Sequence, residues 1–123
     1  MKTVLIVDDD LGFLFWLGHA LGAAGYEPLP ASTPADAHSL LQHFSLPLDL
    51  LIVNPALPRI VEFVESLRSS HTALKIIAAA SAGDTRIGRV DAYCNKPAVP
   101  DEEAKSQWLE VVRHTLESRP AAP

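Results

Sequence analysis

Short apolar runs that lack polar alternation recur along this chain, and helical stretches separate them. A strand covered on one face alternates apolar and polar residues, whereas a strand buried on both faces of a parallel sheet reads as a continuous apolar run. The runs of the second kind are TVLIV (3–7), LLIV (50–53), KIIAAA (75–80) and DAYCN (91–95). They predict a parallel β-sheet with helices on both of its faces.

The segments between these runs carry the start and stop signals of helices. A first helix over 11–24 would end before Gly25, a residue suited to the left-handed turn after a helix. Thr33 can cap a second helix that begins at Pro34 and ends near Phe44. Two further helices are predicted over 60–69 and 101–118. Strands and helices therefore alternate along the chain.

A weaker strand, EPLPA at 27–31, contains two prolines at alternate positions. Pro28 and Pro30 would leave one side of the strand without N–H donors, which is typical of a sheet edge. With right-handed crossovers, this edge favours a flavodoxin-like doubly wound five-stranded sheet in the order 2-1-3-4-5. Its crevice opens at the carboxyl ends of strands 1 and 3. The polar residues at those ends are Asp8, Asp9, Asp10 and Asn54.

Length, composition and charge limit the classes of function. A length of 123 residues with 48% hydrophobic content suits one core, so we expect one domain over 1–118 and a tail or linker start over 119–123. A net charge of −5 without a basic run argues against nucleic-acid binding by this domain. No apolar run approaches the roughly 20 residues of a membrane span, so no membrane partner and a cytoplasmic location are expected.

Cysteine and histidine usage adds two expectations. The single cysteine, Cys94, cannot form an intrachain disulfide and is expected to be a small buried apolar side chain. The five histidines show no metal-ligand spacing and are expected at the surface.

The segments VLIVDDD, DLLIVNPALP, AAASA and AYCNKP, in this succession, resemble the receiver domains of two-component response regulators. The resemblance covers nearly the whole chain. It implies that Asp8 and Asp9 match the acidic pair that holds Mg²⁺, with the Ala56 carbonyl as a third ligand. It also implies switch-like positions at the ends of strands 4 and 5, namely Ser81, Tyr93, Lys96 and Pro97. Tyr93 is also expected in the core.

The aspartate that accepts the phosphoryl group in such domains falls on Asn54, and there the pattern breaks. A carboxylate can form an acyl phosphate and carries charge to a divalent cation, whereas a neutral amide does neither well. Asn54 can instead donate a hydrogen bond to Asp8 or Asp9, or accept one from Lys96. The sequence thus predicts an atypical receiver that is non-catalytic and phosphorylation-independent, binds Mg²⁺ weakly or not at all, and acts in a phosphorelay through protein contacts.

Two further departures concern the loops beside this pocket. The loop before the third helix lacks the glycine that the family tends to have. Only twelve positions separate Ser81 from Tyr93, so a fourth helix between them is expected to be shortened or absent.

Two other functions fit parts of the sequence. The Asp-x-Asp of VLIVDDDLG, with Ser81 and Lys96 downstream, resembles haloacid-dehalogenase-type phosphatases, in which Asp8 would be the nucleophile, Asp10 the acid/base, and Mg²⁺ the cofactor. Those enzymes need a further acidic motif, and the candidates here, 101–103, stand at a predicted helix start. The other alternative is an interaction module that binds no ion.

The first helix is apolar nearly all round, which suggests a contact surface. Its predicted core stripe, and that of the last helix, are Leu14, Leu17, Leu21 and Ala24, and Leu109, Val112 and Leu116. Apolar and aromatic residues outside these stripes are candidates for a dimer or partner interface: Phe15, Trp16, His19, Trp108 and Val111. In the alternative, Trp16 packs against the last helix and Trp108 lies along the sheet edge.

Overall fold

The structure, a computed structural model, describes residues 1–43, 47–80 and 89–118. Within them, five parallel strands form one sheet in the order β2-β1-β3-β4-β5, which confirms the predicted flavodoxin-like topology. The strands are β1 (Thr3–Val7), β2 (Glu27–Ala31), β3 (Leu50–Val53), β4 (Lys75–Ala80) and β5 (Ala92–Asn95). The helices are α1 (Leu11–Ala23), α2 (Pro34–His43), α3 (Ile60–Ser70) and α4 (Glu102–Glu117).

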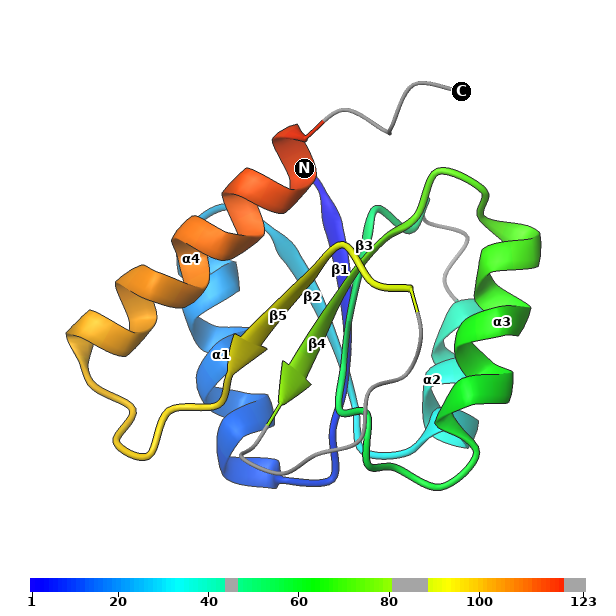
Figure 1. Cartoon of the computed structure of the whole chain (residues 1–123), viewed down its shortest axis with the longest axis horizontal. Coiled ribbons are helices and arrows are strands. Elements are labelled where there is room, and N and C mark those ends of the chain that lie inside the picture. The colour runs from blue at the N-terminus through cyan, green and yellow to red at the C-terminus, as the bar shows by residue number, and fades with distance from the viewer. Residues whose placement is uncertain (44–46, 81–88, 119–123) are drawn as a thin grey trace.

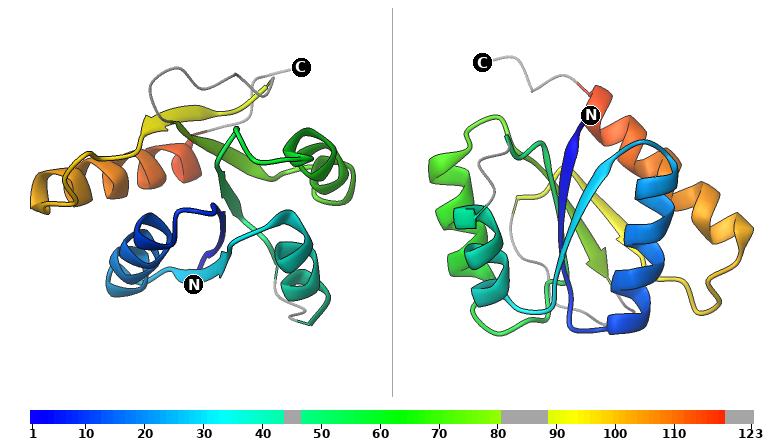
Figure 2. Two further views of the ribbon diagram at one scale, coloured as in Figure 1. Left: turned by 90° about the horizontal axis from the view of Figure 1, so that it is seen from below. Right: turned by 180° about the vertical axis from the view of Figure 1, so that it is seen from behind.

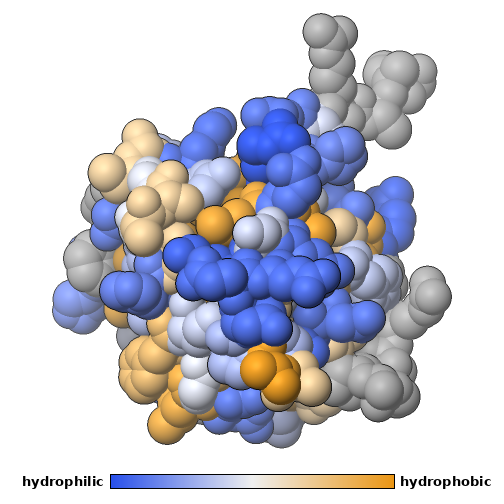
Figure 3. Space-filling view, turned by 90° about the vertical axis from the view of Figure 1, so that its left-hand side faces the viewer, coloured by the Kyte–Doolittle hydropathy of each residue, from blue (hydrophilic) through white to orange (hydrophobic). Residues whose placement is uncertain are grey.

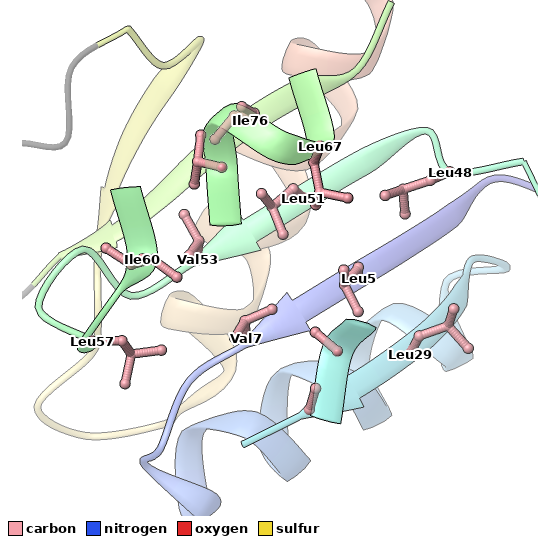
Figure 4. Packing of buried hydrophobic residues seen from close by; sticks show 13 residues of the cluster. Leu5, Val7, Leu29, Leu48, Leu51, Val53, Leu57, Ile60, Leu67 and Ile76 are labelled. Carbon is pink, nitrogen blue, oxygen red and sulfur yellow. The ribbon is translucent and has the colours of Figure 1, made fainter. Parts of the chain in front are cut away.

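Helices cover both faces of the sheet, α1 and α4 on one face and α2 and α3 on the other (Figures 1 and 2). The α1–α4 cluster consists of the buried residues Val4, Ile6, Phe13, Leu14, Leu17, Leu21, Leu50, Ile52, Ile77, Ala79, Cys94, Trp108 and Val112. The α2–α3 cluster consists of Leu5, Val7, Leu29, Ala31, Ala37, Leu48, Leu51, Val53, Leu57, Ile60, Val64, Leu67 and Ile76 (Figure 4). Alternate residues of β1 and β3 serve opposite clusters, which explains why these strands are apolar throughout.

Strand β2 lies at the edge of the sheet, as its prolines predict. Pro28 and Pro30 stand opposite Val4 and Ile6 of β1 in the strand register. Glu27, the residue before Pro28, donates its N–H to the Lys2 carbonyl at 2.8 Å, on the side of β2 that faces β1. Because proline has no backbone N–H, the outer side of β2 lacks hydrogen-bond donors at positions 28 and 30. A further strand therefore cannot pair there readily.

Side-chain caps start three of the helices. The carboxylate of Asp10 accepts from Phe13 N–H at the start of α1, and Asp101 caps α4 in the same way. Thr33 Oγ1 accepts from Asp36 N–H at 3.0 Å, the cap predicted for α2. Helix α3 begins differently, because Arg59 adopts the left-handed region with φ 60°. The loop in which the sequence lacks a glycine thus places an arginine in a conformation that favours glycine.

The predicted core stripes need correction. In α4 the buried residues are Trp108, Val112 and Thr115, whereas Leu109 and Leu116 are partly buried. The stripe is displaced because the Trp108 ring, the largest side chain of this helix, packs on the sheet. In α1 the buried set gains Phe13 and Ala20, and Ala24 is exposed at the helix end.

Some predictions concern segments outside the described residues. The shortened or absent helix between β4 and β5 falls mainly on 81–88, which also includes Ser81, and the tail is 119–123. The described residues 89–91 contain no helix. The fourth helix in chain order, α4, is the one predicted at 101–118. In the described ranges, no helix has the length and apolar character needed to cross a membrane.

Candidate functional site

Three polar side chains meet where β1, β3 and β5 end. Asp8 follows β1 and is fully buried, Asn54 follows β3 and is 9% exposed, and Lys96 follows β5. The chain continues sheet-like hydrogen bonding into each position, since Asn54 N–H donates to Val7 O at 2.9 Å and Lys96 N–H to Ala80 O at 2.9 Å. Adjacent parallel strands end at one edge of the sheet, so the topology itself brings these residues together.

Asp8 is the centre of the site. Its Oδ1 accepts hydrogen bonds from Asp10 N–H at 2.9 Å, Asn54 Nδ2 at 3.2 Å and Lys96 Nζ at 3.2 Å. Its Oδ2 lies 3.0 Å from Lys96 Nζ as an ion pair, although without a well-directed hydrogen bond. The buried carboxylate is therefore neutralised by one ammonium and held by two further donors.

Asn54 uses both ends of its amide. The Oδ1 atom accepts from Ala56 N–H at 2.9 Å, which closes a local turn after β3, and Nδ2 donates to Asp8. This orientation is fixed by its neighbours, because a flipped amide would set its oxygen against a carboxylate and its NH₂ against an N–H. Asn54 thus presents neither a negative charge nor a free nucleophilic oxygen to the crevice.

Lys96 occupies the space between two acids. Its Nζ lies 3.0 Å from Asp8 Oδ2 and 3.5 Å from Asp10 Oδ2, and its side chain is 13% exposed. The ammonium also lies 5.1 Å from the centroid of the Phe13 ring, a cation–π distance. Pro97 follows, half-buried. The packing on three sides holds the ammonium in one place.

The second acid of the site is Asp10 rather than Asp9. Both side chains are exposed, but the Asp10 carboxylate lies 3.5 Å from Lys96 Nζ, whereas Asp9 forms no ion pair with a described residue. The hydrogen bond from Phe13 N–H, together with the Lys96 charge, holds the pKa of Asp10 below its ordinary value. Asp10 is therefore a helix cap that remains ionised, which is unsuited to a general acid.

Magnesium does not fit the residues as they are arranged. The described ranges contain no group of three or more His, Cys, Asp or Glu side chains that could hold a metal ion. The Lys96 ammonium takes the position between Asp8 and Asp10, and Asn54 turns its NH₂ towards Asp8. Of the three ligands that the resemblance implies, Asp8 is buried in the pocket, and Asp9 and Ala56 are exposed.

Known structures with the same fold are receiver domains. A response regulator receiver domain protein (CheY-like) from Methanospirillum hungatei matches with TM-score 0.76 and 25% identity over 95% of this chain and 94% of that chain. The chemotaxis response regulator CheY4 of Vibrio cholerae matches with TM-score 0.71 and 25% identity over 91% and 98%. This chain has the receiver-domain fold of two-component response regulators.

A third similar structure is the response regulator protein TrrA of Thermotoga maritima, in complex with Mg²⁺ and BeF. It matches the receiver fold of this chain with TM-score 0.67 and 26% identity over 90% of this chain and 99% of that chain. No family model matches the sequence, and no curated protein matches it.

None of the structures named above is a phosphatase, and the phosphatase alternative gains no support. A phosphatase of that type would need the acidic residues 101–103 in its site. Here they form the start of α4, where Asp101 is the N-cap.

The remaining switch-like positions of the receiver fold are placed in part. Ser81 lies outside the described residues. Tyr93 on β5 is 39% exposed, so the expectation that it belongs to the core is wrong. Tyr93 lies on β5, an edge strand of the sheet that the described residues form.

The structure contradicts one of the interface candidates, Trp108. Trp108 is 1% exposed, its Nε1–H donates to Asn95 O at 3.1 Å, and its ring contacts Phe13 edge-on at 5.4 Å. It is a core residue that fixes α4 on the sheet. The helix wheel missed this because the aromatic ring reaches inward from the flank of the assumed stripe.

The other candidates differ in exposure. Phe15 is 64% exposed and His19 is exposed, whereas Trp16 and Val111 pack partly against the α1–α4 cluster. On the face seen in Figure 3, hydrophilic side chains cross the middle and separate the apolar areas. Among the described residues, α1 keeps exposed apolar area at Phe15 and Leu11.

Cys94 does not belong to the site chemistry. It is buried in the α1–α4 cluster, and this burial raises its pKa to about 11. Because the thiolate is the reactive form of cysteine, the thiol stays unreactive at neutral pH.

Proposed function

We propose that this receiver-like domain is non-catalytic and acts in two-component signal transduction without being phosphorylated. The observation that carries the proposal is the hydrogen bonding of Asn54, whose amide donates to Asp8 and accepts from the Ala56 N–H. An acyl phosphate requires a carboxylate oxygen at this position. The neighbouring Asp8 cannot replace it readily, because its Oδ1 accepts three hydrogen bonds and its Oδ2 forms an ion pair with Lys96.

The same contacts support the view that Mg²⁺ binds weakly or not at all. A divalent cation would have to displace the Lys96 ammonium from between Asp8 and Asp10. Instead of a cation, the Lys96 ammonium and the Asn54 amide hold the Asp8 carboxylate in one arrangement. The domain would then act as a fixed binding surface in the cytoplasm rather than as a phosphorylation switch.

The proposed partner is a protein, either a signalling component or a second copy of this chain. The surface of α1 supports this, because Phe15 is 64% exposed on a helix without charged residues in its first and last turns. His19, Trp16 and Val111 are the other candidates that stay at least partly accessible. Trp108 no longer belongs to this set.

Incubation with acetyl phosphate and Mg²⁺ should leave the intact mass of the protein unchanged. The reason is that Asn54 has no oxygen able to form an acyl phosphate. Intact-mass spectrometry checks this, with an aspartate-containing receiver domain in the same mixture as the positive control. A stoichiometric gain of one phosphoryl group, lost in mild base, would overturn the proposal.

The Asn54→Asp variant extends this experiment. It is expected not to restore a phosphorylation-dependent switch, because the eleven residues between Ser81 and Tyr93 are too few for a full helix and its connections. Amide spectra with and without the phosphodonor would show whether changes extend beyond the neighbours of residue 54. Donor-dependent shifts throughout the segment before β5 would contradict the expectation.

Phe15→Glu should lower the association state, or the capture of a partner, with little change in melting temperature. The side chain is 64% exposed, so a charge costs little in the free domain but much in an apolar interface. Sedimentation and thermal unfolding measure the two effects. Gln107→Glu, an equal charge change on exposed α4 surface, is the matched control. Unchanged association with a large loss of stability would show that Phe15 is structural.

A further inference from the structure

A second polar pocket lies at the opposite end of the sheet from Asp8. It is formed by the end of α3, the amino ends of β4 and β5, and the segments before them, and it measures about 450 Å³. In Figure 1 this is the upper end of the sheet, where β4 begins after the turn that follows α3. The residues that matter here are Arg68, His71, Leu74, Arg89, Val90 and Asp91.

Two arginines line this pocket without an acidic partner. Arg68 Nε is buried and has no hydrogen-bond partner, and neither Arg68 nor Arg89 forms an ion pair with any described residue. By contrast, Arg113 on α4 pairs with both Glu110 and Glu117. Buried polar groups of native proteins are nearly always paired, so a guanidinium N–H without a partner among the described residues points to an acceptor that those residues do not supply.

Two other polar side chains of the pocket, Asp91 and His71, already make hydrogen bonds within the protein. Asp91, the acidic residue of its lining, accepts from Ile76 N–H at 2.7 Å and so fixes the start of β4 against β5. His71 Nδ1 lies 3.3 Å from Leu67 O, and since a carbonyl only accepts, the ring donates through Nδ1. Two guanidinium charges against one carboxylate leave the pocket cationic on a chain whose net charge is −5.

Apolar side chains complete the wall. Leu74 and Val90 are partly buried and pack against the α2–α3 cluster. A pocket of this volume exceeds what a lone inorganic ion would fill and lies in the usual range of small-molecule sites. The lining therefore combines a place for a charged group with a place for a small apolar group.

We propose that this pocket binds a small organic phosphate, with the phosphate held between Arg68 and Arg89 and the organic part against Leu74 and Val90. The planar guanidinium matches phosphate oxygens through paired hydrogen bonds, and two of them suit a dianion better than a monoanion. The pocket is remote from Asn54 and Lys96. This inference is thus independent of the proposed lack of phosphorylation.

Phenyl phosphate titrated into the whole chain should bind saturably and shift the backbone amides of 68–76 and 89–91. Arg68→Met, which keeps the aliphatic packing, and Arg89→Gln should each weaken binding at least about tenfold, since each removes a charged donor. Arg113→Gln carries the same charge change on a paired surface arginine, and it should alter the affinity by less than about twofold. Calorimetry gives the affinities.

Two further probes test the chemical class. Inorganic phosphate should bind more weakly than phenyl phosphate because it lacks the apolar part, and benzoate should bind more weakly because it carries one charge. Benzoate binding as tight as phenyl phosphate would overturn the assignment to phosphate. Shifts that do not saturate, or a loss in Arg113→Gln as large as in Arg89→Gln, would show general attraction and overturn the site. Arg89 is exposed, so its variant remains decisive even if Arg68→Met does not fold.

Discussion

Lys96→Met should lower the free energy of unfolding by about 3 kcal/mol, because removal of one partner of a buried ion pair leaves an uncompensated charge. The remaining charge is the Asp8 carboxylate, whose side chain is 1% exposed. Asp8 would keep the hydrogen bonds from Asp10 N–H and Asn54, which places the loss at the lower end of the range for buried pairs. Urea denaturation followed by circular dichroism measures it.

The double variant Asp8→Asn/Lys96→Met is the control for this loss. It removes both charges, so more than half of the stability should return if the unpaired carboxylate is the cause. Mg²⁺ should stabilise Lys96→Met and leave the unsubstituted protein nearly unchanged, because the competing ammonium is gone while the acids stay. Equal Mg²⁺ effects on both proteins would contradict the conclusion that Lys96 blocks the cation.

Trp108→Ala should lower the free energy of unfolding by about 3–5 kcal/mol, as expected for a large aromatic residue removed from a core. Trp108 is 1% exposed, contacts Phe13, and donates to the Asn95 carbonyl at the end of β5. Its loss would open a cavity under α4 and leave a carbonyl without its donor. Chemical denaturation provides the measurement.

Two variants separate the contributions at this position. Trp108→Phe keeps an aromatic ring and removes the N–H, so it should cost less than the alanine change, with about 1 kcal/mol due to the hydrogen bond. Trp16→Ala, at a partly buried position of the same cluster, should cost clearly less than Trp108→Ala. Lower association with unchanged stability in Trp108→Ala would restore the surface role that the structure contradicts.

The sheet could be predicted from the sequence because its information is local. A continuous apolar run such as LLIV is buried on both faces wherever it lies, and two prolines in 27–31 exclude a central strand whatever surrounds them. Strand order then follows from connection rules that act on the whole class of parallel sheets. The same rules placed Asp8 and Asn54 at neighbouring strand ends.

Which side chains pair at that edge of the sheet could not be predicted, because it depends on distances between residues that are far apart in the sequence. Asp9 and Asp10 are both acids after β1, and which of them approaches Lys96 depends on how α1 starts, with Asp10 as its cap. The role of Trp108 likewise depended on whether its ring reaches the sheet, which the helix period leaves open by about one residue.

The sequence by itself determined the class of sheet, its edge strand, and the absence of a carboxylate at position 54, since each follows from residue identity and short-range order. Only the tertiary structure decided that Lys96 lies between Asp8 and Asp10, and that Arg68 and Arg89 share a pocket. These pairs are separated by many residues along the chain. Their contact results from the packing of whole elements, in which a shift of a few ångströms makes or breaks an ion pair.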